Sequence, residues 1–162
     1  MAIDRVFGQS SSNVLVAGHR GIRAKYPENT MLSFRKAIEL GVDLVAQHPA
    51  LTLNVEIKQM TTECVDKTVA LLRSFGLLDR IVIASFDASI VRYAHQTHKV
   101  RTQGFPANYM ENFDAHTYEC MYAAGIEMGD LTPELCAEML NRGIDPWGFC
   151  PDTDEGVYHA IR

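Results

Sequence analysis

Short apolar runs alternate with amphipathic, helix-like segments along almost the whole chain, and this alternation limits the folds that the chain can adopt. Each run is bounded by turn or polar residues, as expected of strands buried in a sheet. The predicted strands are Val14–Ala17, Leu51–Lys58 (LTLNVEIK), Ile81–Ser85, Val100–Phe105 and Ile144–Cys150 (IDPWGFC). Because strands separated by helices form parallel sheets, this order predicts an α/β fold, either an open doubly wound sheet or a closed barrel.

The helices between these strands have recognisable beginnings and ends. Residues that cap helices stand at the start of several segments, and glycine follows two of them. The expected helices begin at Asn29 or Thr30 and end before Gly41, cover 61–75, follow Asp87, run from Thr132 and Pro133 to near Gly143, and cover 152–162. The segment from Pro106 to Tyr118 has no clear pattern, so the sequence predicts least there.

Polar residues in the LTLNVEIK strand favour the barrel. Asn54, Glu56 and Lys58 alternate with Leu53, Val55 and Ile57, so one face of this strand is polar. In a barrel, helices cover the outer face while the inner face carries functional groups near the carboxyl-terminal mouth. An antiparallel strand with a solvated face is the alternative. We therefore predict a barrel of parallel strands covered by helices.

The composition fits one ordinary globular domain. The chain has 162 residues, of which 47% are hydrophobic, so one barrel domain is expected to span 1–162. The formal net charge of −5 argues against nucleic acid or an anionic membrane as the main partner. No stretch has the pattern of a signal peptide or a membrane span, which predicts a cytoplasmic protein of undetermined oligomeric state. The widely spaced cysteines are predicted to be reduced thiols: Cys64, Cys120, Cys136 and Cys150.

His19 and Arg20 follow directly on the first predicted strand. This places them at its carboxyl-terminal end, where the active sites of barrels are built. Histidine can transfer a proton near neutral pH, and arginine can hold a phosphate through a planar pair of donors. Together they suggest phosphoryl chemistry. A loop arginine paired with a carboxylate, beside a hydrogen-bonded histidine, is the structural alternative for an isolated His-Arg pair.

Two motifs in succession carry a family resemblance. The segment VAGHRGIRAKYPENTMLSFRKAIELGVD resembles the opening of glycerophosphodiester phosphodiesterases, in which a strand is followed by HRG, a short loop and PENT. LNVEIK resembles a later strand of the same family. IASFD, LTPELCAEMLNRGI and WGFCPDTDEG occur in the family's order, so the resemblance covers nearly all of the chain.

The resemblance implies a TIM-type (β/α)8 barrel, incomplete in this chain. It also implies an enzyme of lipid metabolism that hydrolyses small-molecule glycerophosphodiesters to glycerol 3-phosphate and an alcohol, with a divalent cation, Mg²⁺ or Ca²⁺. His19 would be one of two acid/base histidines, Arg20 a phosphate contact and Glu56 a metal ligand. Carboxylate oxygen suits such hard cations. The residues implied to bind or border the substrate are Lys58, Glu28 and Asn29.

Part of the family's pattern is missing after Val45. A strand bearing E-x-D and a segment ending in H-D would normally follow, but here about five residues separate Val45 from Leu51. A parallel crossover needs about a dozen residues or more, and a complete barrel has roughly 250. The family's last strand is also absent. Two interpretations follow: a sequence that omits segments of a normal enzyme, or an inactive relative that binds a phosphorylated ligand or a protein partner. The first is favoured, because a real deletion would expose core surface.

Overall fold

The computed structural model describes residues 52–149, together with 25–27, 30, 32–33, 35–36, 153 and 155–156. The chain divides into two compact units. One comprises Met1–Asn54 and Asp79–Ile81, and the other comprises Val55–Leu78 and Val82–Arg162. The described helices and strands belong almost entirely to the second unit, and the single barrel domain stays a prediction.

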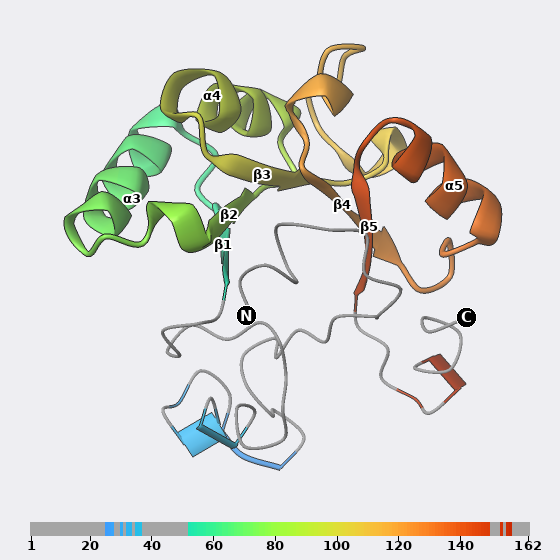
Figure 1. Cartoon of the computed structure of the whole chain (residues 1–162), viewed down its shortest axis with the longest axis horizontal. Helices are drawn as coiled ribbons and strands as arrows, with labels where there is room; N and C mark the ends of the chain where they lie inside the picture. The colour runs from blue at the N-terminus through green and yellow to red at the C-terminus, as the bar shows by residue number, and fades with distance from the viewer. Residues whose placement is uncertain are drawn as a thin grey trace. The chain divides into compact units, whose positions relative to one another are not determined.

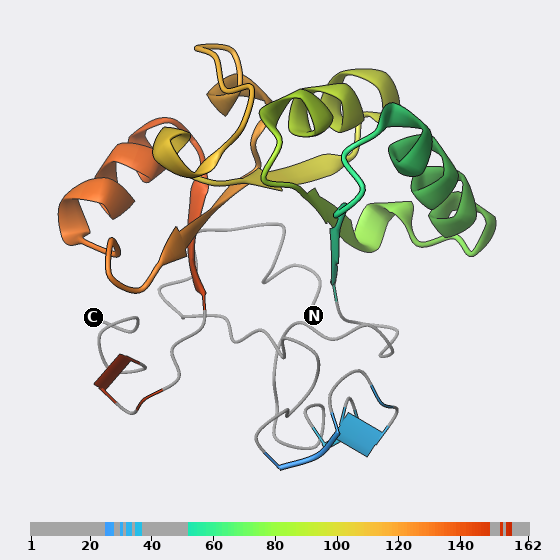
Figure 2. The ribbon, with the colours of Figure 1, turned by 180° about the vertical axis from the view of Figure 1, so that it is seen from behind.

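A five-stranded sheet with sequential strand order β1-β2-β3-β4-β5 forms the centre of the described structure. The pairs β2–β3, β3–β4 and β4–β5 are parallel. Figures 1 and 2 show that the sheet is curled and that three helices lie along its outer side. The strands are β1 (Leu53–Glu56), β2 (Ile81–Ala84), β3 (Arg101–Gly104), β4 (Ala123–Glu127) and β5 (Asp145–Phe149). This curled parallel sheet is part of a barrel and confirms the predicted fold class.

Within residues 52–149, each of three α-helices begins at a side-chain cap in extended backbone. The Thr61 side chain accepts from Cys64 N, the Asp87 side chain from Ser89 N and the Thr132 side chain from Leu135 N. These contacts satisfy amide groups that have no partner within the helix. The helices are α3 (Thr62–Ser74), α4 (Ala88–His98) and α5 (Pro133–Asn141). All three were predicted from the sequence, with Asp87 and Thr132 as caps, whereas Thr61 was predicted as the first residue of its helix.

The connection between β3 and β4 contains no α-helix. It has two short 3₁₀ turns, η2 (Ala107–Tyr109) and η3 (Tyr118–Cys120), and lies in the stretch for which the sequence predicted least. A third such turn, η1 (Leu78–Arg80), leads into β2. Glu111 ties the β3–β4 connection to the end of β2, since its N–H donates to Phe86 O and its carbonyl accepts from Ala88 N, both at 2.9 Å.

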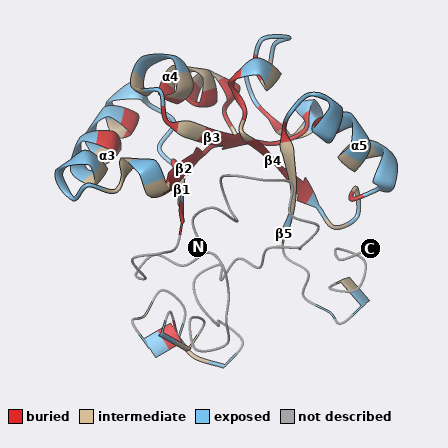
Figure 3. Cartoon of the chain, in the orientation of Figure 1, coloured by how far each residue is buried: buried red, intermediate tan, exposed pale blue. Residues whose placement is uncertain are grey.

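The core lies between the sheet and its helices. Figure 3 shows the buried residues along the strands and on the inner sides of the helices. Ala124 and Ile126 of β4 pack in one cluster with Met139 of α5 and with Ile144. β2 (IVIA) is buried on both faces, as expected of a central parallel strand. β1, the neighbour of β2 in the sheet, differs from it: Leu53 is buried, while Asn54 and Glu56 are exposed.

Several sequence predictions have different outcomes. The predicted strands at 81–85, 100–105 and 144–150 are confirmed as β2, β3 and β5, and LTLNVEIK forms the shorter β1. β4 was not predicted, because AAGIE contains two alanines and a glycine, which are poor strand formers. The Val14–Ala17 strand and most of the 152–162 helix lie outside the described residues. The described cysteines are free thiols: Cys64, Cys120 and Cys136. Within the described residues, no helix has the length and apolarity needed to cross a membrane.

Candidate active site

Glu56 and Lys58 lie at the carboxyl-terminal end of β1. The Lys58 Nζ donates to Glu56 Oε1 at 2.8 Å, and the two side chains are 72% and 32% exposed, respectively. Strand side chains alternate between faces, so residues two apart point to the same side. The pair therefore presents a carboxylate and an ammonium group together on one accessible face, where an ion or a phosphate could bind them.

The neighbours of Glu56 across the sheet follow from the strand register. Ile57 N donates to Ala84 O at 2.8 Å, which sets Glu56 beside Ala84 in a parallel ladder. Ala84 is paired with Gln103, and Gln103 with Ala123. Because Ala124 packs in the core with α5, the alternate residue Ala123 and its row lie on the face turned away from the helices. In a barrel this is the inner face, as the polar alternation of LTLNVEIK predicted.

Aromatic rings lie farther along this inner face, toward the carboxyl ends of the strands. Phe86 and Phe105 stack with their ring centroids 3.6 Å apart, and Phe149 meets Phe105 edge-on at 5.9 Å. Gly125 of β4 makes room for this arrangement, since a Cβ there would lie 2.6 Å from Phe105 Cε1 and 2.6 Å from Gln103 Nε2. The aromatic group therefore forms an apolar wall beside the row that contains Glu56.

Asp87 lies near the end of β2 but has a structural role. Its Oδ1 accepts from Ser89 N at 2.8 Å, and its Oδ2 accepts from Asn112 Nδ2 at 3.1 Å. Burial raises the pKa of this carboxyl, but the hydrogen bonds from Ser89 and Asn112 outweigh it and the pKa lies below its usual value. The carboxylate is thus held ionised by the α4 cap and by the β3–β4 connection.

Sequence reasoning missed a second acidic group at the carboxyl ends of the strands. The Tyr109 hydroxyl donates to Asp130 Oδ2, and Glu127 is the exposed last residue of β4. The hydrogen bond to Asp130, with burial and the charge of Glu127, raises the pKa of Tyr109 to about 12, so the phenol stays protonated. An apolar run that ends in a carboxylate, AAGIE, resembles the end of LNVEIK and was the available signal.

The other predicted site residues lie outside the described part of the chain: His19, Arg20, Glu28 and Asn29. Two residues of the same motif are described by themselves. The Thr30 hydroxyl donates to Pro27 O at 2.7 Å and accepts from Ser33 N at 3.2 Å. Residues 32–33 and 35–36 are helical. Thr30 therefore caps the helix that follows PENT, which is one of the two caps that the sequence allowed.

The metal prediction rests on Glu56. Its accessible carboxylate supplies the oxygen that Mg²⁺ and Ca²⁺ prefer. Among the residues that the structure describes, no group of three or more His, Cys, Asp or Glu side chains is placed to hold an ion. Glu56 therefore fits a metal site as one ligand of a set, and the described residues do not complete that set.

The fold and this site define a class: an α/β protein with a curled parallel sheet and charged groups at the carboxyl end of a strand. A family model described as glycerophosphoryl diester phosphodiesterase matches residues 19–48. The segment thus contains His19, Arg20, Glu28 and Asn29, and it extends three residues past Val45. A search of curated proteins finds no match.

Two solved structures resemble the chain over most of its length. One is a proposed glycerophosphodiester phosphodiesterase from Galdieria sulphuraria, with 13% identity, a TM-score of 0.73, and coverage of 94% of this chain and 92% of that one. The other is a proposed glycerophosphoryl diester phosphodiesterase from Silicibacter pomeroyi DSS-3, with 16% identity, a TM-score of 0.74, and coverage of 90% and 85%. The family model thus matches the segment that carries most of the sequence resemblance, and the two structures, at 13% and 16% identity, support the barrel fold of this chain.

Proposed function

We propose that the protein is a glycerophosphodiester phosphodiesterase, which hydrolyses its substrate to glycerol 3-phosphate and an alcohol with the help of a divalent cation. The observation that carries this proposal is the pairing of Glu56 and Lys58, 2.8 Å apart on the accessible face at the end of β1. Carboxyl ends of barrel strands are where such enzymes assemble their catalytic groups. The match of residues 19–48 to the family model supports it independently.

The proposed roles follow from the chemistry of each group. Lys58 carries an ammonium group that stabilises negative charge on the phosphoryl oxygens, and Arg20 holds the same phosphate through paired donors. His19 transfers a proton to or from an attacking or leaving oxygen. Glu28 and Asn29 border the substrate. A divalent cation, when bound, would offset phosphoryl charge, and Glu56 is the residue proposed to ligate it.

The 2.8 Å contact between Glu56 and Lys58 has a consequence for binding. Exposed ion pairs contribute little to stability, so either partner can exchange the other for a ligand at small cost. Glu56 is thereby available to a cation, and Lys58 to a phosphate. The carboxylate also keeps the ammonium group near the strand end until substrate arrives.

A second function belongs to a different class: an inactive relative that binds a phosphorylated ligand. The observation in its favour is that the described residues supply only part of a metal site, together with the absence of E-x-D after Val45 in the sequence. Such a protein would keep the phosphate contacts of Arg20 and Lys58 without turnover.

One assay separates the two functions. Purified protein, with its intact mass verified against the 162-residue sequence, is incubated with glycerophosphocholine and Mg²⁺ or Ca²⁺, and glycerol 3-phosphate is measured. The enzyme releases glycerol 3-phosphate, and a chelator stops the release. No release with either ion, alongside binding of glycerol 3-phosphate, would establish the inactive relative instead.

A further inference from the structure

A cavity lies at the amino-terminal edge of the sheet, the edge opposite to Glu56 and Lys58. Its volume is about 280 Å³, and its lining includes His95, Lys99, Arg101 and Tyr122. Arg101 is the first residue of β3, and Tyr122 directly precedes β4. Because the strands are parallel, the cavity and the proposed active site lie at opposite ends of them.

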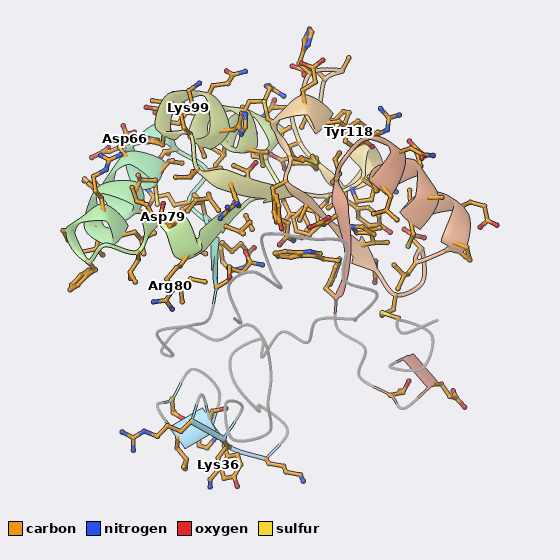
Figure 4. All side chains as sticks on the ribbon, viewed as in Figure 1. Lys36, Asp66, Asp79, Arg80, Lys99 and Tyr118 are labelled. Atoms are coloured by element: carbon orange, nitrogen blue, oxygen red, sulfur yellow. The ribbon has the colours of Figure 1, made fainter. Side chains whose placement is uncertain are left out.

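The cavity has an excess of positive charge. Lys99 and Arg101 both carry positive charge, and they line the same cavity. Figure 4 labels Lys99, which lies where α4 ends. Within the described residues, no ion pair involves the Lys99 ammonium group. This charge stands out in a chain whose formal net charge is −5.

The backbone fixes the direction from which Lys99 approaches. Lys99 has a left-handed conformation, with φ of 55°, and its N–H donates to His95 O at 3.0 Å. This residue ends α4 and turns the chain toward Arg101, so that side chains from the helix end and the strand start line one cavity. The last-turn carbonyl of His95 is also satisfied, which reduces its repulsion of an anion.

Arg101 and Tyr122 form the other side. The Arg101 guanidinium carbon lies 5.7 Å from the centroid of the Tyr122 ring. Burial, together with the charge of Asp145 and a hydrogen bond to it, raises the pKa of the Tyr122 phenol, so the hydroxyl is protonated and donates to Asp145. Tyr122 thus links the guanidinium to a counter-charge on β5 that limits its movement.

We propose that this cavity binds a small phosphate-bearing anion, held by Arg101 and Lys99 and separate from the Glu56–Lys58 site. Arginine offers paired donors to phosphate oxygens, and lysine offers a point charge. Ligand pockets span roughly 300 to 1,000 Å³, so a cavity of about 280 Å³ suits inorganic phosphate or a phosphate ester of a few carbons. This binding does not depend on the proposed hydrolysis.

The competing explanation is structural. Basic side chains in the last turn of a helix interact favourably with its carbonyl groups, and His95 and Lys99 are at that end of α4. In that case Lys99 stabilises α4 but has no ligand. The two explanations differ in what removal of the charge does to phosphate binding.

The test titrates the full-length protein with inorganic phosphate and, separately, with glycerol 3-phosphate, using calorimetry and the shift in thermal midpoint. The comparison uses Lys99→Gln, Lys58→Gln and the remote control Lys67→Gln on α3, whose lysine is 77% exposed. Phosphate bound at the cavity is expected to weaken by about tenfold or more in Lys99→Gln, whereas Lys67→Gln binds as wild type. The phosphate affinity that remains in Lys58→Gln measures binding that does not need the proposed active site.

Arg101→Lys provides a second variant that keeps the charge but loses the planar pair of donors. It is expected to weaken phosphate binding while far-UV circular dichroism stays unchanged. Tighter binding of glycerol 3-phosphate than of phosphate, lost in Lys99→Gln, would identify an ester as the ligand. The proposal is overturned if wild type binds neither anion at millimolar concentrations, if all binding disappears in Lys58→Gln, or if Lys99→Gln lowers the thermal midpoint without changing phosphate affinity.

Discussion

The Asn112 side-chain amide donates to Asp87 Oδ2 at 3.1 Å, while Asp87 Oδ1 accepts from Ser89 N at 2.8 Å. One carboxylate therefore starts α4 and also holds the β3–β4 connection against the end of β2. This connection has no α-helix of its own, and Glu111 links its main chain to the end of β2. Asp87 thus organises two segments that are 25 residues apart in the sequence.

Asp87→Ala should lower the free energy of unfolding more than the loss of a simple cap does. Loss of an N-cap costs about 1 kcal/mol, and a hydrogen bond to a charged group contributes roughly 1.5–3 kcal/mol more. Urea denaturation measures the change. Thr132→Ala, which removes only the cap of α5, is the matched control. Asn112→Gly removes the amide but suits the φ of 53° at this position. Equal losses in Asp87→Ala and Thr132→Ala would show that the link to Asn112 adds nothing.

Gly125→Ala should destabilise the protein by about 1–3 kcal/mol, because the new methyl group overpacks the core. Its Cβ would lie 2.6 Å from both Phe105 Cε1 and Gln103 Nε2. Gly129→Ala is the control, since a Cβ there meets nothing within 4 Å. Thermal or urea unfolding of the two variants gives the comparison. If Gly125→Ala is as stable as Gly129→Ala, the close approach of Phe105 is not a constraint.

Glu56→Gln should reduce turnover at least about tenfold at low metal concentration, with partial recovery as Mg²⁺ or Ca²⁺ is raised. Replacement of a carboxylate by an amide weakens a hard-cation site without removing its oxygen. The assay is release of glycerol 3-phosphate as a function of ion concentration. Glu63→Gln breaks a comparable exposed pair, Glu63–Lys67, and should leave turnover unchanged. A loss of the same depth at every metal concentration would assign Glu56 a different role.

His19→Ala should abolish turnover while the far-UV spectrum and the thermal midpoint stay close to those of wild type. Removal of a general acid or base lowers rates by about 10² to 10⁴-fold. His116→Ala replaces an exposed histidine on the β3–β4 connection and serves as the control. Near-normal turnover in His19→Ala would remove this histidine from the mechanism.

Asp66→Asn should make stability less dependent on pH in acid. Asp66 Oδ1 lies 2.7 Å from His98 Nε2 and accepts from the Tyr93 hydroxyl at 2.9 Å. These contacts link α3, which carries Asp66, to α4 (Figure 4). The hydrogen bonds from His98 and then Tyr93 lower the pKa of Asp66 below its ordinary value of 3.8. A carboxyl with a lowered folded-state pKa stabilises the fold above its unfolded pKa and loses this contribution as pH falls through the folded value.

Urea midpoints from about pH 5 to about pH 2 test the sign of this linkage. The difference in stability between wild type and Asp66→Asn should be constant near pH 5 and shrink toward the acid end. Tyr93→Phe removes one of the two donors to Asp66. In a Tyr93→Phe background, Asp66→Asn should therefore change the stability less than it does in wild type. A difference that grows as pH falls would contradict the assignment.

The elements with strong local signals were predictable from the sequence. Thr61, Asp87 and Thr132 cap helices whose apolar stripes are clear, because these interactions are local and depend on a few neighbouring residues. β4 was missed, since its alanines and glycine form a strand only because Phe105, Gln103 and Met139 pack around it. That packing depends on tertiary contacts that a single sequence does not display.

In the candidate active site, too, local features were predictable from the sequence and tertiary contacts were not. Glu56 and Lys58 could be predicted as a pair, because alternation in a strand places them on one face, and the structure brings their charged groups together. The stack of Phe86 on Phe105, and the meeting of Tyr109 with Asp130, join residues from different connections. Their proximity depends on strand register across the sheet, which the periodicity of one segment does not determine.

The close packing of Phe105 over Gly125 should also limit which residues occur at these two positions in homologous sequences. The Phe105 ring fills the space that a side chain at position 125 would need, so a larger residue at 125 requires a smaller one at 105. Among relatives that keep this strand register, an alanine or serine at the position of Gly125 should occur with a smaller side chain at the position of Phe105. Covariation of these two positions among homologues would then indicate, from sequences alone, that β3 and β4 are neighbours in the sheet.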